Sequence, residues 1–191
     1  MPWSLDPHHT SVTFSAKHLG VATVRGSFGQ VEADVELDDP NDPTTGRGTI
    51  TIKSASITTG SEQRDGHLKS ADFLDVEKYP DIVFKVTSIT SHGDQFKVVG
   101  DLTIKDISKE ISLDYEHSGS VTDPFGNVKV GGTLTGTINR SDWGLTWNVP
   151  LGGGGFLVGE KVKLEIDGEL TQEKAAAEES AAAEAATSAT A

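Results

Sequence analysis

The chain has 191 residues, no cysteine, and 16 basic against 29 acidic residues, which gives a formal net charge of -13. This length suits one domain with a substantial core, and the lack of cysteine excludes disulfides, thiolate metal ligands and cysteine nucleophiles. Because the negative charge is spread along the chain, we expect no nucleic-acid partner, since a phosphate backbone would be repelled.

Apolar residues recur at every second position through most of the chain, which is the pattern of strands with one buried face. The first such segments are Trp3 to Asp6 and Thr10 to Lys17. A second block covers residues 24–37, and the alternation shifts phase at Gly29, which predicts a β-bulge there. Another strand is expected over residues 48–57.

Residues 61–70 break the two-residue period with a charged segment of helical character. Ser61 is expected as the helix cap, with Glu62 in the first turn, where a negative charge is favourable. We predict a short helix here, within a lid segment over residues 61–75.

The alternation resumes at Ile82 and continues to Leu170 in several further strands. A sheet patterned in this way must curl or pair with a second sheet to cover its apolar face, and the last strand is expected to close against the start of the chain. From Gln172 onward the residues offer too little apolar variety for a core. We therefore expect one domain over residues 1–171 and a tail over 172–191 that is disordered or a frayed helix.

The start of the chain and its apolar runs bear on where in the cell the protein is expected. The stretch Met1 to Asp6 has neither the basic region nor the apolar region of a signal peptide, so we expect a cytoplasmic protein, or an exported one if a leader was removed. Since no apolar run approaches the roughly 20 residues of a membrane helix, the protein is not expected to span a membrane.

Four sequence blocks, in order, are similar to segments of one known family. The blocks are His9 to Phe14 with Lys17 to Gly20 and Gly26 to Phe28, Arg64 to Leu74 with Tyr79 and Pro80, Gly100 to Ile104 with Ser108 to Leu113, and Ile138 to Leu145. Over roughly Trp3 to Thr171, the chain thus resembles the YceI-like family, described as lipid- or polyisoprenoid-binding proteins of lipocalin-like shape. It departs from the family pattern in its Ala/Glu tail and at Lys105 and Asp106, a turn where a smaller pair ending in Gly is expected.

The resemblance implies an all-β fold: an eight-stranded antiparallel lipocalin-like β-barrel with the short helix or lid segment near one end. It also implies non-enzymatic binding, sequestration or transport of an amphiphilic lipid in an apolar tunnel. The lipid would be a polyisoprenoid, an isoprenoid quinone or a long acyl chain. Homodimers are common in such proteins, and no cofactor is implied.

Large apolar residues from many strands and from the lid segment are expected around the tunnel or at its rim. They are Phe14, Phe28, Ile50, Ile52, Leu68, Phe73, Phe84, Val86, Leu102, Leu134, Ile138, Trp143 and Trp147. Small inward residues favour a hollow interior over a filled one. These are Ala16, Gly100, Gly132 and Gly136.

Polar candidates for contact with a lipid head group are His18, Arg64, His67 and Arg140, because a guanidinium suits phosphate geometry. Arg64, Asp65 and His67 lie within one helical turn. An alternative function is therefore a small-molecule enzyme in which His67 and Asp65 act on an isoprenoid or quinone head group. We favour a structural role, in which Arg64 and Asp65 pair with the backbone and with neighbouring strands to pin the helix.

Other chemical sites are less well supported. His8, His9 and His18 would need a further ligand to bind zinc or copper, and no carboxylate or cysteine stands at a spacing that completes such a site, so no metal is expected. His92 and His117 are expected in solvated turns. The four glycines at 152–155 could form an anion-binding nest, but a mobile hairpin is the better prediction, and no Gly-x-Ser-x-Gly elbow indicates a serine hydrolase.

Overall fold

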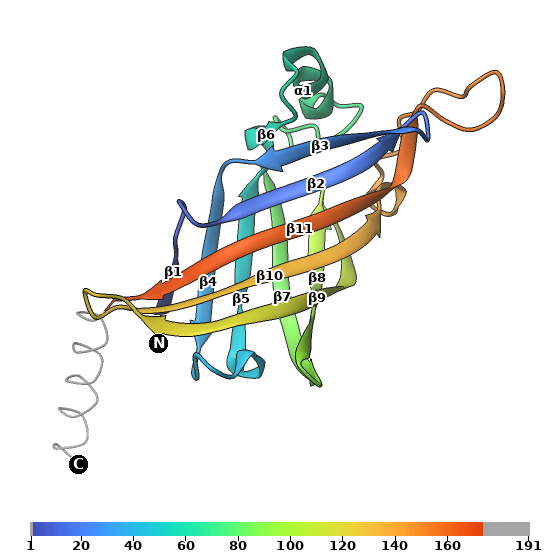
Figure 1. The fold of residues 1–191 in the computed structure, drawn as a ribbon. Coiled ribbons are helices and arrows are strands. Elements are labelled where there is room, and N and C mark those ends of the chain that lie inside the picture. Colours follow the sequence, from blue (N-terminus) through green and yellow to red (C-terminus); the bar gives the residue numbers. More distant parts are fainter. Residues whose placement is uncertain (1, 174–191) are drawn as a thin grey trace, which may run out of the picture.

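The computed structural model describes residues 2–173, whose strands form one curled antiparallel sheet (Figure 1). The strands are β1 (Pro2–Leu5), β2 (Ser11–His18), β3 (Ala22–Phe28), β4 (Val31–Leu37), β5 (Gly46–Lys53), β6 (Ile57–Thr58), β7 (Asp81–His92), β8 (Gln95–Ile104), β9 (Ile107–Thr122), β10 (Val128–Asn139) and β11 (Val158–Gln172). The helical elements are α1 (Glu62–Lys69) and the short 3-10 turns η1 (Pro43–Thr45), η2 (Ser54–Ser56) and η3 (Arg140–Trp143).

The sheet closes into a barrel because the first strand pairs on both sides. Trp3 of β1 lies opposite Val35 of β4, and Leu5 of β1 lies opposite Leu170 of β11. Within residues 2–173 the closed order is β1, β4, β5, β7, β8, β9, β10, β11 and back to β1, which makes eight strands. The expected eight-stranded antiparallel barrel is therefore confirmed.

At three places in the barrel wall, a separate strand extends the sheet toward the end that carries α1. β2 follows β1 beside β11, β3 leads into β4, and β6 follows β5. The bulge predicted at Gly29 is wrong, because the strand ends at Phe28 and a new one begins at Val31. β3 pairs with β2 and β6, whereas β4 pairs with β1 and β5, so the change of partners explains the shift in phase.

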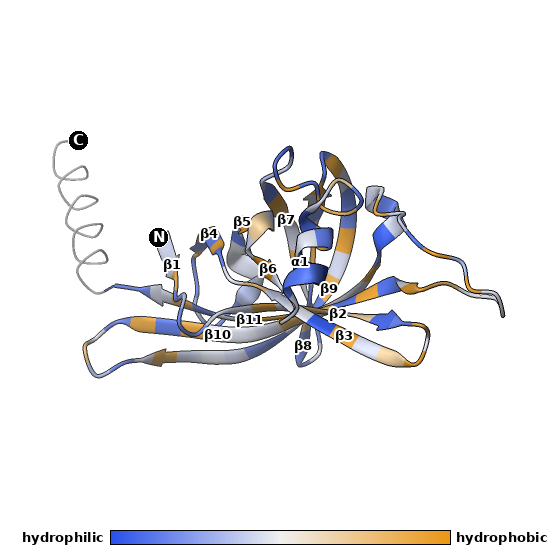
Figure 2. Cartoon of the chain, turned by 90° about the horizontal axis from the view of Figure 1, so that it is seen from above, coloured by the Kyte–Doolittle hydropathy of each residue, from blue (hydrophilic) through white to orange (hydrophobic). Residues whose placement is uncertain are grey.

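The inward faces of the strands build two apolar clusters, and the alternation of hydropathy along the strands is visible in Figure 2. The larger cluster includes the buried residues Phe84 and Leu102. The smaller cluster joins Trp3, Leu37 and Val130 near the N-terminus, at the end opposite α1 (Figure 1). The indole nitrogen of Trp3 donates to the carbonyl oxygen of Leu37 at 3.0 Å, so this cluster is also fixed by a buried hydrogen bond.

The predicted helix is present as α1, which sits across one end of the barrel (Figure 1). Ser61 occupies the cap position, and its carbonyl oxygen accepts from the amide of Asp65 at 2.8 Å. The predicted cap residue is therefore confirmed, although the Ser61 hydroxyl makes no capping bond within the described chain. All eight residues of α1 keep some exposure to solvent, so the helix is attached to the barrel by few buried groups.

Side chains of α1 bind the segment that leads into it. The Asp65 carboxylate accepts from the Thr59 amide at 2.8 Å and from the hydroxyl groups of Thr58 and Thr59. These bonds, led by that of the Thr59 hydroxyl, lower the pKa of Asp65. The Arg64 guanidinium donates to the hydroxyl and carbonyl oxygens of Thr59 at 2.7 and 3.0 Å. The structure thus gives Arg64 and Asp65 the local pinning role that we favoured, on the preceding segment.

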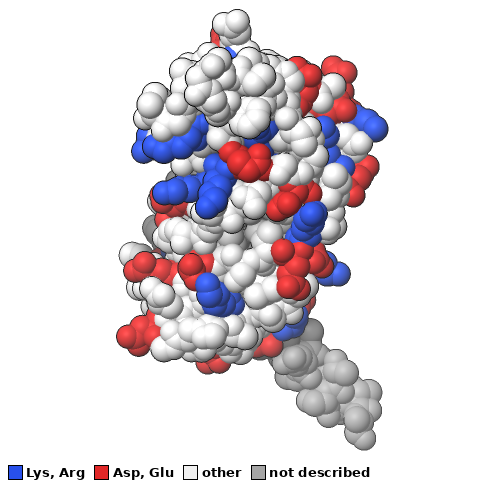
Figure 3. All heavy atoms as spheres, turned by 90° about the vertical axis from the view of Figure 1, so that its right-hand side faces the viewer, with Lys and Arg blue, Asp and Glu red and all other residues white. Residues whose placement is uncertain are grey.

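On the face shown in Figure 3, basic and acidic side chains alternate over the surface. Within residues 2–173, no helix is long and apolar enough to cross a membrane. The tail predicted to be disordered or a frayed helix covers residues 172–191. This is wrong for Gln172, which is the last residue of β11, and residues 174–191 lie outside the described part. The domain boundary at residue 171 stays a prediction.

Candidate ligand-binding cavity

A cavity of about 360 Å³ lies inside the barrel. Its lining runs from Leu68 of α1 and Phe73, which follows α1, to Leu37 and Val130 at the opposite end. The walls are almost wholly apolar, and the volume falls in the range of sites that enclose small molecules. The interior is therefore hollow along much of its length.

Most of the residues that we expected around a tunnel do border this cavity. They are Phe14, Phe28, Ile50, Ile52, Leu68, Phe73, Phe84, Val86, Leu102, Leu134 and Ile138. The two tryptophans of that set lie outside the lining. Trp143 is only 2 % exposed and belongs to the larger apolar cluster, where its indole nitrogen donates to the carbonyl oxygen of Leu102 at 2.9 Å. Trp143 therefore packs between elements of the barrel instead of facing the hollow.

Trp147 belongs to an aromatic cluster with His67 and Phe73, which we call the lid cluster. The His67 ring lies 4.5 Å from the Trp147 ring and 5.0 Å from the Phe73 ring, edge-on to both. Its Nε2 is 2.8 Å from a carboxylate oxygen of Asp72. His67 is thus paired with Asp72, whereas Asp65 is bonded to threonines, so the pair required by the enzyme alternative is not formed.

Small inward residues do not all enlarge the cavity. Of the four that we expected, Ala16 and Gly132 border it, whereas Gly100 and Gly136 do not. A Cβ atom at Gly100 would meet the Phe84 ring at 2.7 Å, and one at Gly132 would meet the Tyr115 ring at 2.3 Å. These glycines make room for neighbouring rings. Gly168 differs, because it borders the cavity and no atom of residues 2–173 beyond its chain neighbours lies within 4 Å of its Cβ position.

The head-group candidates do not converge. Arg64 is bonded to Thr59, His67 belongs to the lid cluster, and His18 lies at the end of β2 opposite Val158, so all three are outside the lining. Arg140 does border the cavity and is only 4 % exposed.

Every nitrogen of the Arg140 guanidinium already donates to a backbone carbonyl. The acceptors are Leu145 at 2.5 Å, Trp147 and Gly159 at 3.0 Å, and Val158 at 3.5 Å. Burial lowers the pKa of Arg140, although the nearby Glu160 carboxylate opposes this effect. The side chain therefore holds residues 145–159 against the barrel wall, where it is engaged before any ligand arrives.

A polar group that the sequence did not reveal lies toward the other end of the cavity. Thr10, Tyr115 and His117 all border the hollow. The Tyr115 hydroxyl is 3.2 Å from Nδ1 of His117 and 3.4 Å from the carbonyl oxygen of Gly131. Burial raises the pKa of Tyr115 to about 12. The solvated turn expected for His117 is wrong, because His117 lies within β9 and its Nε2 is buried.

The alternation of Leu113, Tyr115 and His117 was the signal that could have placed His117 inside. Gly119, two residues after His117, suggests a turn in the sequence. In the structure it belongs instead to an irregularity of pairing, where Gly131 lies opposite Gly119 and Gly132 lies opposite His117.

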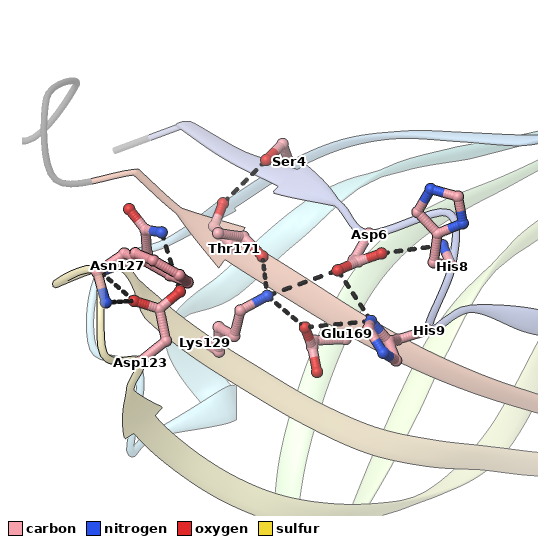
Figure 4. Close-up of polar contacts among 10 residues, drawn as sticks. Ser4, Asp6, His8, His9, Asp123, Asn127, Lys129, Glu169 and Thr171 are labelled. Carbon is pink, nitrogen blue, oxygen red and sulfur yellow. Dashed lines mark hydrogen bonds and ion pairs between the residues drawn. The ribbon is translucent and has the colours of Figure 1, made fainter.

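A charged cluster on the outside joins the connection between β1 and β2 to β10 and β11 (Figure 4). His9 Nδ1 lies 3.0 Å from Asp6, while Lys129 Nζ lies 2.5 Å from Glu169 and 3.5 Å from Asp6. The hydrogen bond with His9 holds the pKa of Asp6 far below its usual range, and the same bond raises the pKa of His9.

This cluster corrects one expectation. Asp6, His9 and Glu169 place one ligand atom each within 4.8 Å of one another, so carboxylates do accompany a histidine, which the sequence spacing did not suggest. The Lys129 ammonium contacts both carboxylates and supplies the positive charge that a metal would otherwise provide. We therefore assign the cluster a role in closing the barrel.

The geometry agrees with comparisons to known proteins. The YceI-like domain model matches residues 3–170. UPF0312 protein SA2479 of Staphylococcus aureus (strain N315) is 42% identical over 170 residues, which cover 88% of this chain and 96% of that protein.

Solved structures show the same architecture. The YCEI protein of Campylobacter jejuni matches with a TM-score of 0.71 and 32% identity, over 83% of this chain and 90% of that one. A polyisoprenoid binding domain from Saccharophagus degradans matches with a TM-score of 0.63 over 90% of this chain and 98% of that one; at 13% identity, this likeness concerns the fold alone. The chain belongs to the YceI-like family.

Proposed function

We propose that this protein binds one amphiphilic lipid without chemical turnover and holds its apolar chain inside the barrel. The observation that carries the proposal is the apolar cavity of about 360 Å³, to which the lid segment and most strands contribute. The chain would be a polyisoprenoid, the tail of an isoprenoid quinone, or a long acyl chain. The name of the Saccharophagus degradans neighbour supports the first of these.

The physical basis is removal of apolar surface from water. Each Å² of hydrocarbon that leaves water for this lining contributes about 25 cal/mol, so an extended chain binds without any polar contact. An apolar wall discriminates weakly between chains that differ by one methylene, so selectivity for the tail is expected to be loose. Selectivity must then come from the length of the hollow and from the head group.

Entry is expected at the end covered by α1. Leu68, Phe73 and Leu74 from this segment border the cavity, while α1 itself is partly exposed throughout. The other end is closed by the Trp3 cluster, which belongs to the hydrogen-bonded wall. A ligand would therefore pass beneath α1, and sequestration or transport would depend on how often that segment opens. The homodimer and the cytoplasmic location stay predictions.

The test is organic extraction of freshly purified protein followed by lipid mass spectrometry. Phe84→Asp places a carboxylate in the lining of the cavity and should abolish the extracted lipid. Val83→Asp makes the same kind of change on the outer side of β7. Circular dichroism identifies variants that fail to fold. Equal lipid in wild type and folded Phe84→Asp protein, or none in the wild type even after incubation with prenyl and acyl lipids, would refute the proposal.

A further inference from the structure

Two buried polar atoms toward one end of the cavity have no hydrogen-bond partner within residues 2–173. Thr10 Oγ1 and His117 Nε2 are both shielded from solvent, and neither makes a hydrogen bond to any residue that the structure describes. Both residues border the same cavity, whose other walls are apolar. Since nearly all buried polar groups in native proteins are hydrogen-bonded, two unpaired atoms on residues that line one hollow need an explanation.

The group is held in place by its surroundings. The Phe96 ring lies 6.2 Å from the rings of both Tyr115 and His117. Gly132 leaves space for the Tyr115 ring, and the Tyr115 hydroxyl lies within hydrogen-bonding distance of Nδ1 of His117. The contact through Nδ1 leaves Nε2 as the free position of the imidazole. Depending on the tautomer, Nε2 either donates or accepts, and the threonine hydroxyl does both.

We propose that Thr10 and His117, with Tyr115 behind them, form a hydrogen-bonding subsite for the neutral head group of a lipid that enters head first. The head group would carry a hydroxyl or a carbonyl, as in a prenyl alcohol or a prenyl quinone. This inference rests on the proposed function, because it assigns the orientation and the head-group class of the ligand in the same cavity.

The electrostatics of the lining favour a neutral head group over a phosphate or carboxylate. Within residues 2–173, the Lys and Arg side chains that border the cavity are Arg47 and Arg140. Arg140 donates to backbone carbonyls, and Arg47 forms ion pairs with Glu36 at 2.7 Å and Asp38 at 3.1 Å. An anion drawn into this hollow would lose its hydration without gaining a free cation. The raised pKa of Tyr115 agrees with this penalty on charge.

The test compares ligands of one chain length on delipidated full-length protein. The probes are geranylgeraniol, the matching hydrocarbon without the hydroxyl, and geranylgeranyl diphosphate, each measured by displacement of an apolar fluorescent dye. A quinone with a prenyl tail of similar length serves as the carbonyl probe. The expected result is that the alcohol, the quinone or both bind about threefold to tenfold more tightly than the hydrocarbon, since one or two hydrogen bonds are gained.

The variants separate a head-group subsite from a structural role. Thr10→Val and His117→Leu should each abolish the preference over the hydrocarbon and change the affinity for the hydrocarbon less than twofold. Thr10→Val should also leave the ligand-free melting temperature equal or higher, because only an unpaired buried atom is removed, whereas His117→Leu also removes the contact between Nδ1 and the Tyr115 hydroxyl. Thr135→Val makes the same change as Thr10→Val on an exposed position of β10 and should preserve the preference.

The outcomes distinguish this inference from the proposed function. If the hydrocarbon binds as tightly as the alcohol and the quinone, or if the diphosphate binds most tightly, the inference is overturned while lipid binding stands. A preference that survives in both Thr10→Val and His117→Leu overturns it as well. If none of the probes binds the wild-type protein, both the inference and the proposed function fail.

Discussion

The two ends of the barrel are closed in different ways. At one end, α1 is pinned through Asp65 to residues six or seven positions away, and its eight residues all keep some exposure. At the other end, Trp3 donates to Leu37 from inside the wall, and the ion pairs of Lys129 join residues far apart in the chain. We therefore expect the first closure to open while the barrel persists, whereas opening of the second would separate β1 from its neighbours.

The largest loss of stability is expected at the end of the barrel closed by Trp3. Trp3→Ala should lower the free energy of unfolding by about 3–5 kcal/mol, because it leaves a cavity in the smaller cluster and removes the donor to the Leu37 carbonyl. Urea denaturation followed by circular dichroism measures this change. If the free energy of unfolding falls by less than about 1 kcal/mol, the Trp3 end does not contribute the stability that we assign to it.

At the α1 end, Trp147→Ala should cost less stability and act mainly on ligand exchange. Removal of the indole frees one side of His67 and of Phe73, so we expect a loss of about 1–2 kcal/mol and release of an apolar dye about tenfold faster. Stopped-flow displacement measures the rate. Unchanged release in Trp147→Ala, with faster release in Trp3→Ala, would reverse the roles of the two ends.

The charged cluster of Asp6, His9, Lys129 and Glu169 should make the stability of the Trp3 end depend on pH. The pKa of Asp6 is lowered from 3.8, so its contribution is present above that value and is lost as pH falls through the lower folded value. The pKa of His9 is raised from 6.5, so its contribution is complete below 6.5 and is lost as pH rises through the higher folded value.

Stability from this cluster should therefore be greatest between about pH 4 and 6.5. Thermal melts across pH 3 to 9 test this, and His9→Gln should flatten the basic limb. His92→Gln is a control at an exposed histidine of β7, and an equal effect of the two substitutions would show that the Asp6 contact is not responsible.

The smallest change in stability is expected at the turn between β8 and β9, which lies on the α1 side. Lys105 and Asp106 both have positive φ values, 52° and 61°, which a two-residue hairpin requires and which favour Asn and Gly. Replacing the pair with Asn-Gly should raise the free energy of unfolding by about 0.5–1 kcal/mol and leave dye release unchanged. Denaturant melts would contradict this account if the replacement destabilised the protein.

The sequence predicts the barrel well because strand alternation assigns each side chain to the inner or outer face. For the same reason, most of the lining residues, from Phe14 to Ile138, are predictable one by one. Alternation does not fix which strands are neighbours, so the meeting of Asp6 and Glu169, or of Thr10 and His117 on one cavity, could not be predicted. Nor does it show that Phe84 and Tyr115 fill the space beside the inward glycines.

In the proposed function, the hollow of the barrel holds the lipid chain. Gly168→Leu extends a side chain into the open space of the cavity, whereas Gly131→Leu places the same side chain outside the lining. Native mass spectrometry of delipidated protein mixed with geranylgeraniol should show a one-to-one complex for the wild type and for Gly131→Leu, and a strongly reduced complex for Gly168→Leu. Equal complex formation by the two folded variants, or the absence of any complex with the wild type, would contradict the account.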